Sequence, residues 1–132
     1  MRYYDNDIRY GKYDHFKELL INKRIVEWNE DSLILEDGTK ITIECSEQDC
    51  CAGAYGKFKN VKLDAMITNV SLPEITNIPD EDTVVNQAKV TIFHNQNPIA
   101  IADFYADAGN GGYYYSVASF VIKDVHYKVV EA

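Results

Sequence analysis

Long apolar runs are absent from this chain of 132 residues, which also has only three cysteines and three prolines. No stretch approaches the roughly 20 apolar residues of a membrane-spanning helix. The opening residues, MRYYDNDIRY, lack the apolar core of a signal peptide. An odd number of cysteines, two of them adjacent, does not make a disulfide framework. We therefore expect an intracellular, cytoplasmic protein with reduced thiols.

Positive charge is scarce as well, since the chain has 13 Lys and Arg residues and 21 Asp and Glu residues, which gives a net charge of −8. Nucleic-acid polymers and anionic membranes are bound through basic surfaces, so we expect neither DNA, RNA nor a membrane as partner. The acidic residues are scattered, with one run at Asp80-Glu81-Asp82, which disfavours a DNA mimic. The length fits one domain over residues 1–132.

Tyrosine is abundant, with ten copies beside five Phe and one Trp. Its ring is apolar and its hydroxyl polar, so tyrosine suits half-buried sheet faces and binding surfaces. Four tyrosines lie in an N-terminal arm, residues 1–13, together with Arg2 and Arg9. This arm is either a surface segment or edge strand, or it closes over a ligand or a second subunit. In the second case Arg would bind phosphate and stack on a base.

Residues 14–45 are predicted to form a short helix and a three-strand meander. Asp14 is a candidate N-cap, because its carboxylate can accept from the free N–H groups of the first turn. Phe16, Leu19 and Leu20 follow as an apolar stripe at helical spacing. The predicted strands are 24–29, 32–36 and 40–45, with a hairpin turn at Asp37-Gly38.

Residues 46–87 are predicted to be an irregular connection, because glycines loosen the backbone and because Pro73 and Pro79 restrict residues 67–78 to an edge strand or a loop. Residues 88–132 return to alternation and are predicted to form antiparallel hairpins. The whole pattern predicts a mainly β fold with a minor α part: an antiparallel sheet or partly closed barrel with one short N-terminal helix. The expected C-terminal strands are 88–94, 99–106, 113–122 and 125–130, with turns at 95–98 and 107–112.

Residues 45–56, CSEQDCCAGAYG, contain all three cysteines. Together with FKELLINKRIVEW and SLILEDGTKITIE, the segment SEQDCC resembles a family of small uncharacterised bacteriophage proteins, a domain of unknown function with a short helix, a DG hairpin and a QDCC motif. The resemblance covers about residues 16–52. It implies a phage context and no activity, and Ala52 departs from the acid that is common in the family. The matching motif residues are Glu47, Gln48, Asp49, Cys50 and Cys51.

The cysteines are interpreted as structural. Zinc ligands are usually spaced two to four residues apart in two pairs, and these cysteines are not. The carboxylates of Glu47 and Asp49 would oppose a thiolate beside them, which disfavours a nucleophilic cysteine. We therefore expect no metal, no cofactor and no catalytic residue. The thiols are expected to pack inside, at a switch point where the N-terminal hairpin passes to the C-terminal sheet.

Tyrosines and scattered cations provide candidate ligand contacts. On a strand, Tyr113 and Tyr115 would share one face, with Tyr105 across the hairpin, as a stacking platform for a base or for a partner's side chains. Alternatively, one set of tyrosines lies in the core and the other covers a sheet edge. The predicted ligand-binding residues are Arg2, Arg9, Arg24, Tyr55, Lys57, Lys59, Tyr105, Tyr113 and Tyr115.

No nucleophile with a matching base is evident, so we expect a binding protein and not an enzyme. The first hypothesis is a phage-encoded anti-defence protein, a sponge that sequesters a small nucleotide immune signal in a pocket of Tyr, Arg and Lys within the host cytoplasm. The second is a protein–protein interaction module that inhibits a host defence protein. The third is an enzyme that degrades such a nucleotide. Edge strands and exposed tyrosines also favour homo-oligomerisation.

Overall fold

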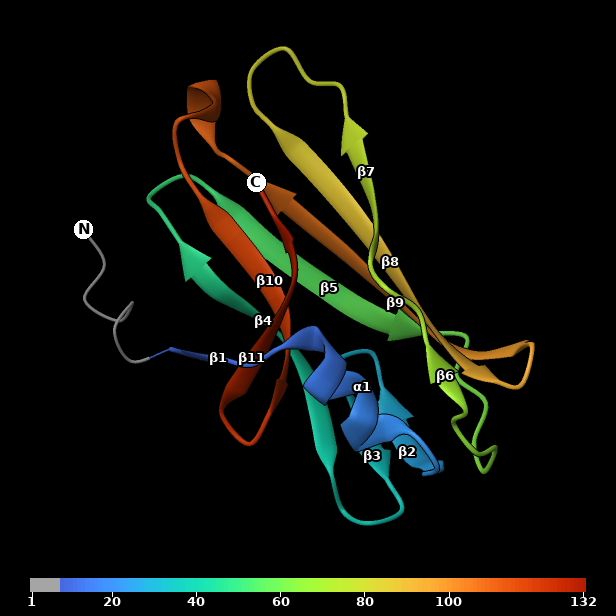
Figure 1. Ribbon diagram of the computed structural model, residues 1–132. Coiled ribbons are helices and arrows are strands. Elements are labelled where there is room, and N and C mark those ends of the chain that lie inside the picture. The colour runs from blue at the N-terminus through green and yellow to red at the C-terminus, as the bar shows by residue number, and fades with distance from the viewer. Residues whose placement is uncertain (1–7) are drawn as a thin grey trace.

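The computed structural model describes residues 8–132, which form two β-sheets and one short α-helix (Figure 1). The predicted mainly β class with a short N-terminal helix is confirmed, and neither sheet closes into a barrel. Within the described range, no helix has both the length and the apolar character needed to cross a membrane.

The six-stranded sheet joins the N-terminal meander to the C-terminal hairpin. Its central contact is the antiparallel pairing of β4 with β10, which brings distant parts of the chain together. The hairpin between β10 and β11 turns at Lys123 and Asp124, which both have the positive φ that a tight hairpin turn requires. In spatial order the strands are β1 (Arg9–Tyr10), β11 (Val125–Glu131), β10 (Ser116–Ile122), β4 (Lys40–Gln48), β3 (Ser32–Leu35) and β2 (Ile25–Asn29).

The five-stranded sheet corrects the prediction that residues 46–87 are an irregular connection, although an edge strand within residues 67–78 was one of the two expected alternatives. Pro73 and Pro79 flank a strand at the sheet edge, where the N–H group that proline lacks is not needed for a hydrogen bond between strands. Gly56 lies inside strand β5, where a residue without a side chain is needed, because a Cβ there would come within 2.7 Å of the Asp103 carbonyl oxygen. The strands are β5 (Gly53–Lys59), β9 (Asn97–Asp107), β8 (Val85–His94) and β6 (Asn69–Val70) in spatial order, with β7 (Glu74–Ile78) also paired to β8.

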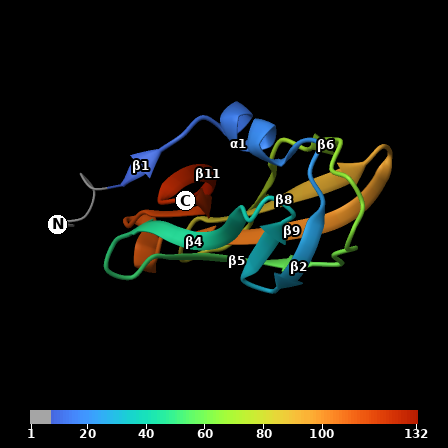
Figure 2. The ribbon, with the colours of Figure 1, turned by 90° about the horizontal axis from the view of Figure 1, so that it is seen from below.

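The core lies between the two sheets and is centred on Phe120 of β10. The Phe120 ring stacks on Phe16 with centroids 4.3 Å apart, and it also contacts Phe58 of β5 and Phe104 of β9. All four side chains are buried. Phe16 belongs to helix α1 (Tyr13–Leu20), which contacts β11 of one sheet and β6 of the other. The helix therefore closes one side of the core (Figure 2).

The ends of α1 differ in part from the prediction. The N-cap residue is Lys12, and no side chain caps the helix, so the assignment of Asp14 as N-cap is wrong. Asp14 lies in the first turn, where its negative charge complements the helix dipole. At the other end, Asn22 has a positive φ of 68° and its N–H donates to the carbonyl of Ile67. This conformation stops the helix, and Asn adopts it readily.

Within the described range, the chain passes from one sheet to the other between β4 and β5 and returns between β9 and β10. The two crossovers lie against each other, because the N–H of Asp49 donates to the carbonyl of Tyr115 and the Ser116 hydroxyl donates to the carbonyl of Gly53. The predicted hairpin between 99–106 and 113–122 is therefore wrong. Gly109, Gly111 and Gly112 all have positive φ and lead the chain out of the five-stranded sheet, so β10 begins only at Ser116.

Candidate functional site

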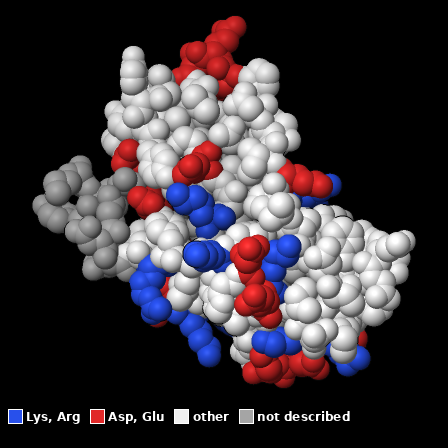
Figure 3. All heavy atoms as spheres, in the orientation of Figure 1, with Lys and Arg blue, Asp and Glu red and all other residues white. Residues whose placement is uncertain are grey.

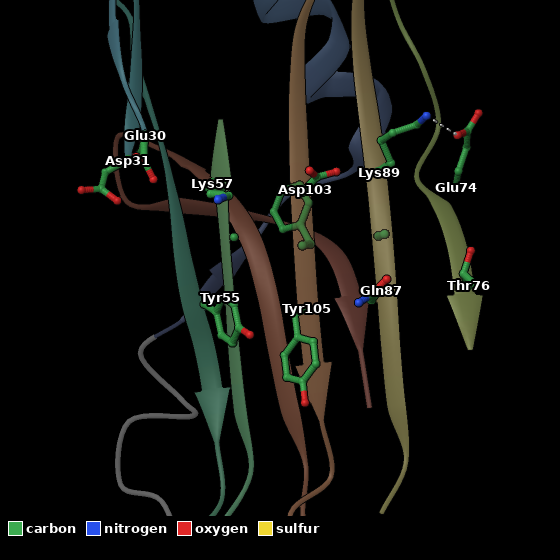
Figure 4. A pocket seen from close by; sticks show the side chains of 13 residues that line it. Glu30, Asp31, Tyr55, Lys57, Glu74, Thr76, Gln87, Lys89, Asp103 and Tyr105 are labelled. Atoms are coloured by element: carbon green, nitrogen blue, oxygen red, sulfur yellow. Dashed lines mark ion pairs between the residues drawn. The ribbon is translucent and has the colours of Figure 1, made fainter. Parts of the chain in front are cut away.

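An open hollow of about 740 Å³ lies on the outward face of the five-stranded sheet (Figure 4). Strands β5, β9, β8 and β7 lie side by side in register, so their outward side chains form rows across the sheet. Glu30 and Asp31 come from the turn between β2 and β3 and line the hollow on the β5 side. The first row is Tyr55, Tyr105, Gln87 and Thr76, and the second is Lys57, Asp103, Lys89 and Glu74.

Tyr55 and Tyr105 form a stacked pair in the first row. Their ring centroids are 4.9 Å apart and their planes differ by 25°. The Tyr55 side chain is 64% exposed, so the pair presents apolar ring surface to solvent. Partial burial, followed by the charge of Asp107 and the proximity of Tyr55, raises the pKa of Tyr105 above its ordinary value. Its hydroxyl is therefore a neutral hydrogen-bond donor at physiological pH.

The second row is charged. Lys59, which neighbours the hollow on β5, forms an ion pair of 2.6 Å with Asp103, and Lys89 lies 3.9 Å from Glu74. Among residues 8–132, Lys57 has no ion-pair partner. The lining contains two lysines and four carboxylates, so it suits a ligand that offers hydrogen-bond donors together with a limited negative charge. Those carboxylates belong to Glu30, Asp31, Glu74 and Asp103.

The structure brings together part of the predicted ligand-binding set. Tyr55, Lys57 and Tyr105 line the hollow, and Lys59 is beside it. The expected platform of Tyr105 with Tyr113 and Tyr115 is not formed, because β9 and β10 belong to different sheets. Tyr55 provides the second ring instead.

The remaining predicted residues lie elsewhere. Arg9 is in β1, in the other sheet, and Arg24 forms an isolated bridge with Met66. Tyr113 is 88% exposed beyond the 3-10 helix η2 (Asn110–Gly112), and the Tyr115 hydroxyl donates to the carboxylate of Glu131. Arg2 lies outside the described residues.

Several lining residues were not predicted from the sequence. The alternation in β8 was a usable signal, because it places Gln87 and Lys89 on the same face. The pairing of β8 with both β7 and β9 could not be predicted from the local sequence. The row that joins Thr76, Gln87 and Tyr105 was therefore not predicted.

The cysteine segment is where the chain changes sheets, as the sequence indicated, but the expected burial of its thiols is wrong. Cys45, Cys50 and Cys51 are all exposed. Strand β4 continues beyond Cys45 to Gln48, and Cys50 and Cys51 occupy the turn that follows it. Cys50 and Cys51 lie in a turn that does not reach the core between the sheets, and Cys45 is exposed on strand β4.

Within this segment, Ser46 joins a polar cluster that the sequence did not reveal. Its hydroxyl lies 2.7 Å from the Ser119 hydroxyl and 2.7 Å from Nδ1 of His126. The Tyr10 ring contacts His126 edge-on, and its hydroxyl donates to Glu47. A nucleophilic serine needs a base that a third group orients, and among residues 8–132 no hydrogen bond to Nε2 of His126 is formed. We interpret the cluster as a link between β1, β4, β10 and β11.

Comparison with known proteins finds that a family model described as a domain of unknown function, DUF7448, matches residues 18–121. The chain belongs to the DUF7448 family. No curated protein and no solved structure matches it. The DUF7448 match begins in α1 and ends in β10, so it includes β5, β7, β8 and β9, which line the hollow, and the cysteine segment.

Proposed function

We propose that this DUF7448 protein is a non-catalytic binding protein that captures a small nucleotide in the hollow over β5, β9, β8 and β7. The observation that carries the proposal is the stacked pair of exposed Tyr55 and half-buried Tyr105, one row away from Lys57 and Lys89. Base stacking on an aromatic side chain contributes about 1–3 kcal/mol and does not depend on which base is bound. The same surface supplies cations for phosphate.

Each row has a role in this proposal. The base stacks on Tyr55 and Tyr105, and Lys57 binds a phosphate, because its ammonium group has no carboxylate partner among the described residues. Ribose hydroxyls donate to the carboxylate of Asp103 and to the side chain of Gln87. Because carboxylates outnumber lysines in the lining, the ligand we expect is rich in hydroxyls and poor in phosphates, such as an ADP-ribose derivative.

The biological role we propose is that of a phage-encoded sponge. In the host cytoplasm the protein would hold a nucleotide immune signal and so counter host defence. The phage context is supported by the resemblance of the helix, the DG hairpin and the QDCC segment to bacteriophage proteins. The ligand class is supported by the hollow.

The test is native mass spectrometry with thermal shift across a panel of cyclic and ADP-ribose-derived nucleotides. We expect a one-to-one complex with at least one hydroxyl-rich member, which is released chemically intact on heat denaturation. A panel without any binder would refute the proposal. A converted nucleotide in the released fraction would replace the sponge with a nucleotide-degrading enzyme.

A second candidate function is inhibition of a host protein through the edge of the same sheet. Among residues 8–132, strand β7 pairs with β8 alone, and near its other edge Leu72 is 63% and Ile75 is 52% exposed. Unpaired edges accept a strand from a partner. Acidic side chains gather at the top of Figure 3, over the loop between β7 and β8, which contains Asp80, Glu81 and Asp82. A basic partner fits this surface.

The edge is tested with Ile75→Lys, because a lysine on an edge strand opposes strand addition. If a host protein is the target, wild type captures it stoichiometrically, Ile75→Lys does not, and neither responds to the nucleotide panel. A dimer that dissociates on dilution and is lost in Ile75→Lys would instead identify a second copy of this chain as the occupant. Capture that is unchanged in Ile75→Lys would exclude the edge.

A further inference from the structure

The adjacent thiols of Cys50 and Cys51 lie together on the surface. Their Sγ atoms are 3.4 Å apart, and both side chains are exposed in the turn between β4 and β5. Neither cysteine belongs to the hydrophobic core. The pair is also separate from the hollow, whose lining contains no cysteine. Core packing and the proposed nucleotide site therefore leave this pair of sulfur atoms without a role.

The geometry of neighbouring residues disfavours a disulfide between Cys50 and Cys51. Consecutive Cα atoms are about 3.8 Å apart across a trans peptide, whereas disulfide-bonded cysteines usually have Cα atoms about 4.4–6.8 Å apart. A bond between neighbours would be strained, and strained disulfides are easily reduced. In a reducing compartment both thiols stay available at the same time.

Two neighbouring thiols are a chelating pair for a soft metal ion. Thiolates select copper(I) and zinc among the biological metals. Zinc in protein sites normally takes four ligands, but no group of three or more His, Cys, Asp and Glu residues among residues 8–132 is placed to hold a metal. Copper(I) is satisfied by two thiolates on opposite sides of the ion, and the exposed Cys50 and Cys51 side chains have room to rotate apart from their present 3.4 Å separation. The number of available ligands therefore favours copper(I) over zinc.

We propose that Cys50 and Cys51 form a two-thiolate site for a soft monovalent metal ion, copper(I). Binding forms two copper–sulfur bonds and releases the two thiol protons to solvent, with no change in oxidation state. The hydrogen bond that the Cys51 thiol donates to Cys50 raises the pKa of Cys51. Metal must displace these protons, so the apparent affinity rises with pH.

The test is an anaerobic titration of the full-length protein with copper(I) supplied as a coloured chelator complex, whose loss of colour reports transfer. We expect one copper(I) per chain in wild type. Mutation of an outer-shell partner of a metal costs 10–100-fold in affinity, so removing a ligand should cost more than about 100-fold in each of Cys50→Ser and Cys51→Ser. Cys45→Ser is the matched control, since Cys45 is also exposed but lies on β4, and it should bind as wild type does.

Copper binding that survives in Cys50→Ser or Cys51→Ser, or that is lost in Cys45→Ser, would overturn the proposal. Circular dichroism of each variant confirms that it is folded, which the exposure of all three thiols leads us to expect. A parallel zinc titration checks the choice of ion. Zinc bound more tightly than copper(I), at one ion per two chains through Cys50 and Cys51, would overturn the copper(I) assignment.

Discussion

Tyr55 of β5 lies directly opposite Tyr105 of β9, and the two rings stack with centroids 4.9 Å apart. Cross-strand aromatic pairs stabilise a sheet modestly, but this pair is outside the core and Tyr55 is 64% exposed. Its open ring faces are apolar surface that a planar ligand can cover. The pair therefore organises the hollow, and it is the first target for mutation.

Removing either ring should weaken nucleotide binding without unfolding the protein. We expect Tyr55→Ala and Tyr105→Ala each to lose about 1–3 kcal/mol of binding free energy, roughly 5- to 150-fold in Kd, because each loses a stacking face. Isothermal titration calorimetry with the best binder of the panel measures this. The control is Tyr113→Ala, since Tyr113 is 88% exposed and does not line the hollow. An equal loss in the control would contradict the assignment.

The charges of the lining should affect binding in opposite directions. Lys57→Gln removes a cation from beside the ligand and should weaken binding by roughly 10- to 150-fold, since hydrogen bonds to charged groups contribute about 1.5–3 kcal/mol. Glu30→Gln removes a carboxylate from the lining and should strengthen the binding of a phosphorylated ligand. Lys40→Gln in β4 of the other sheet is the control for net charge. If Lys57→Gln and Lys40→Gln weaken binding equally, the effect is not local to the hollow.

Gly109 should be essential to the packing of the two crossovers. Gly109 and Gly112 both have a positive φ, +71° and +72°, so alanine is strained at either position, and the ψ of −167° places Gly109 in a region that is essentially restricted to glycine, at a cost of about 1–3 kcal/mol. A Cβ on Gly109 would also lie 2.8 Å from the carbonyl carbon of Cys51, whereas one on Gly112 meets nothing closer than 3.6 Å. Overpacking adds about 1–3 kcal/mol. Urea unfolding should therefore show Gly109→Ala to be clearly less stable than Gly112→Ala, and equal stabilities would contradict the close approach.

The bond from Tyr115 to Glu131 should make stability depend on pH. The Tyr115 hydroxyl and, to a smaller extent, Lys128 lower the pKa of Glu131. A lowered pKa means that the stabilisation is present above the unfolded-state pKa and is lost as the pH falls through the folded-state pKa. Because Glu131 is exposed, Tyr115→Phe should cost at most about 1 kcal/mol at neutral pH.

Urea unfolding of wild type and Tyr115→Phe between neutral and acidic pH measures this dependence. The difference between the two proteins should shrink as the carboxylate of Glu131 becomes protonated. Tyr113→Phe serves as the control and should follow wild type throughout, because among the described residues its hydroxyl has no hydrogen-bond partner. A difference that stays constant with pH would show that Tyr115 does not act through Glu131.

Elements with strong local signals were predictable. The helix followed from Phe16 and Leu20, which are buried at helical spacing, and the hairpin followed from Asp37-Gly38, where Gly38 has a φ of 90°. The missed strand β5 has a weaker signal, because Gly53 and Gly56 are rare inside strands. Gly56 is explained only by the close approach of Asp103, which the local sequence does not contain.

The sequence by itself determined the fold class, the helix and the hairpin, because the period of apolar residues and the chemistry of tight turns act over a few neighbours. It also indicated that the chain changes course at the cysteine segment. Only the tertiary structure decided that Tyr105 pairs with Tyr55 and not with Tyr113, and that Cys50 and Cys51 face solvent. Those outcomes depend on which strands share a sheet, and strand order is set by the packing of distant side chains around Phe120.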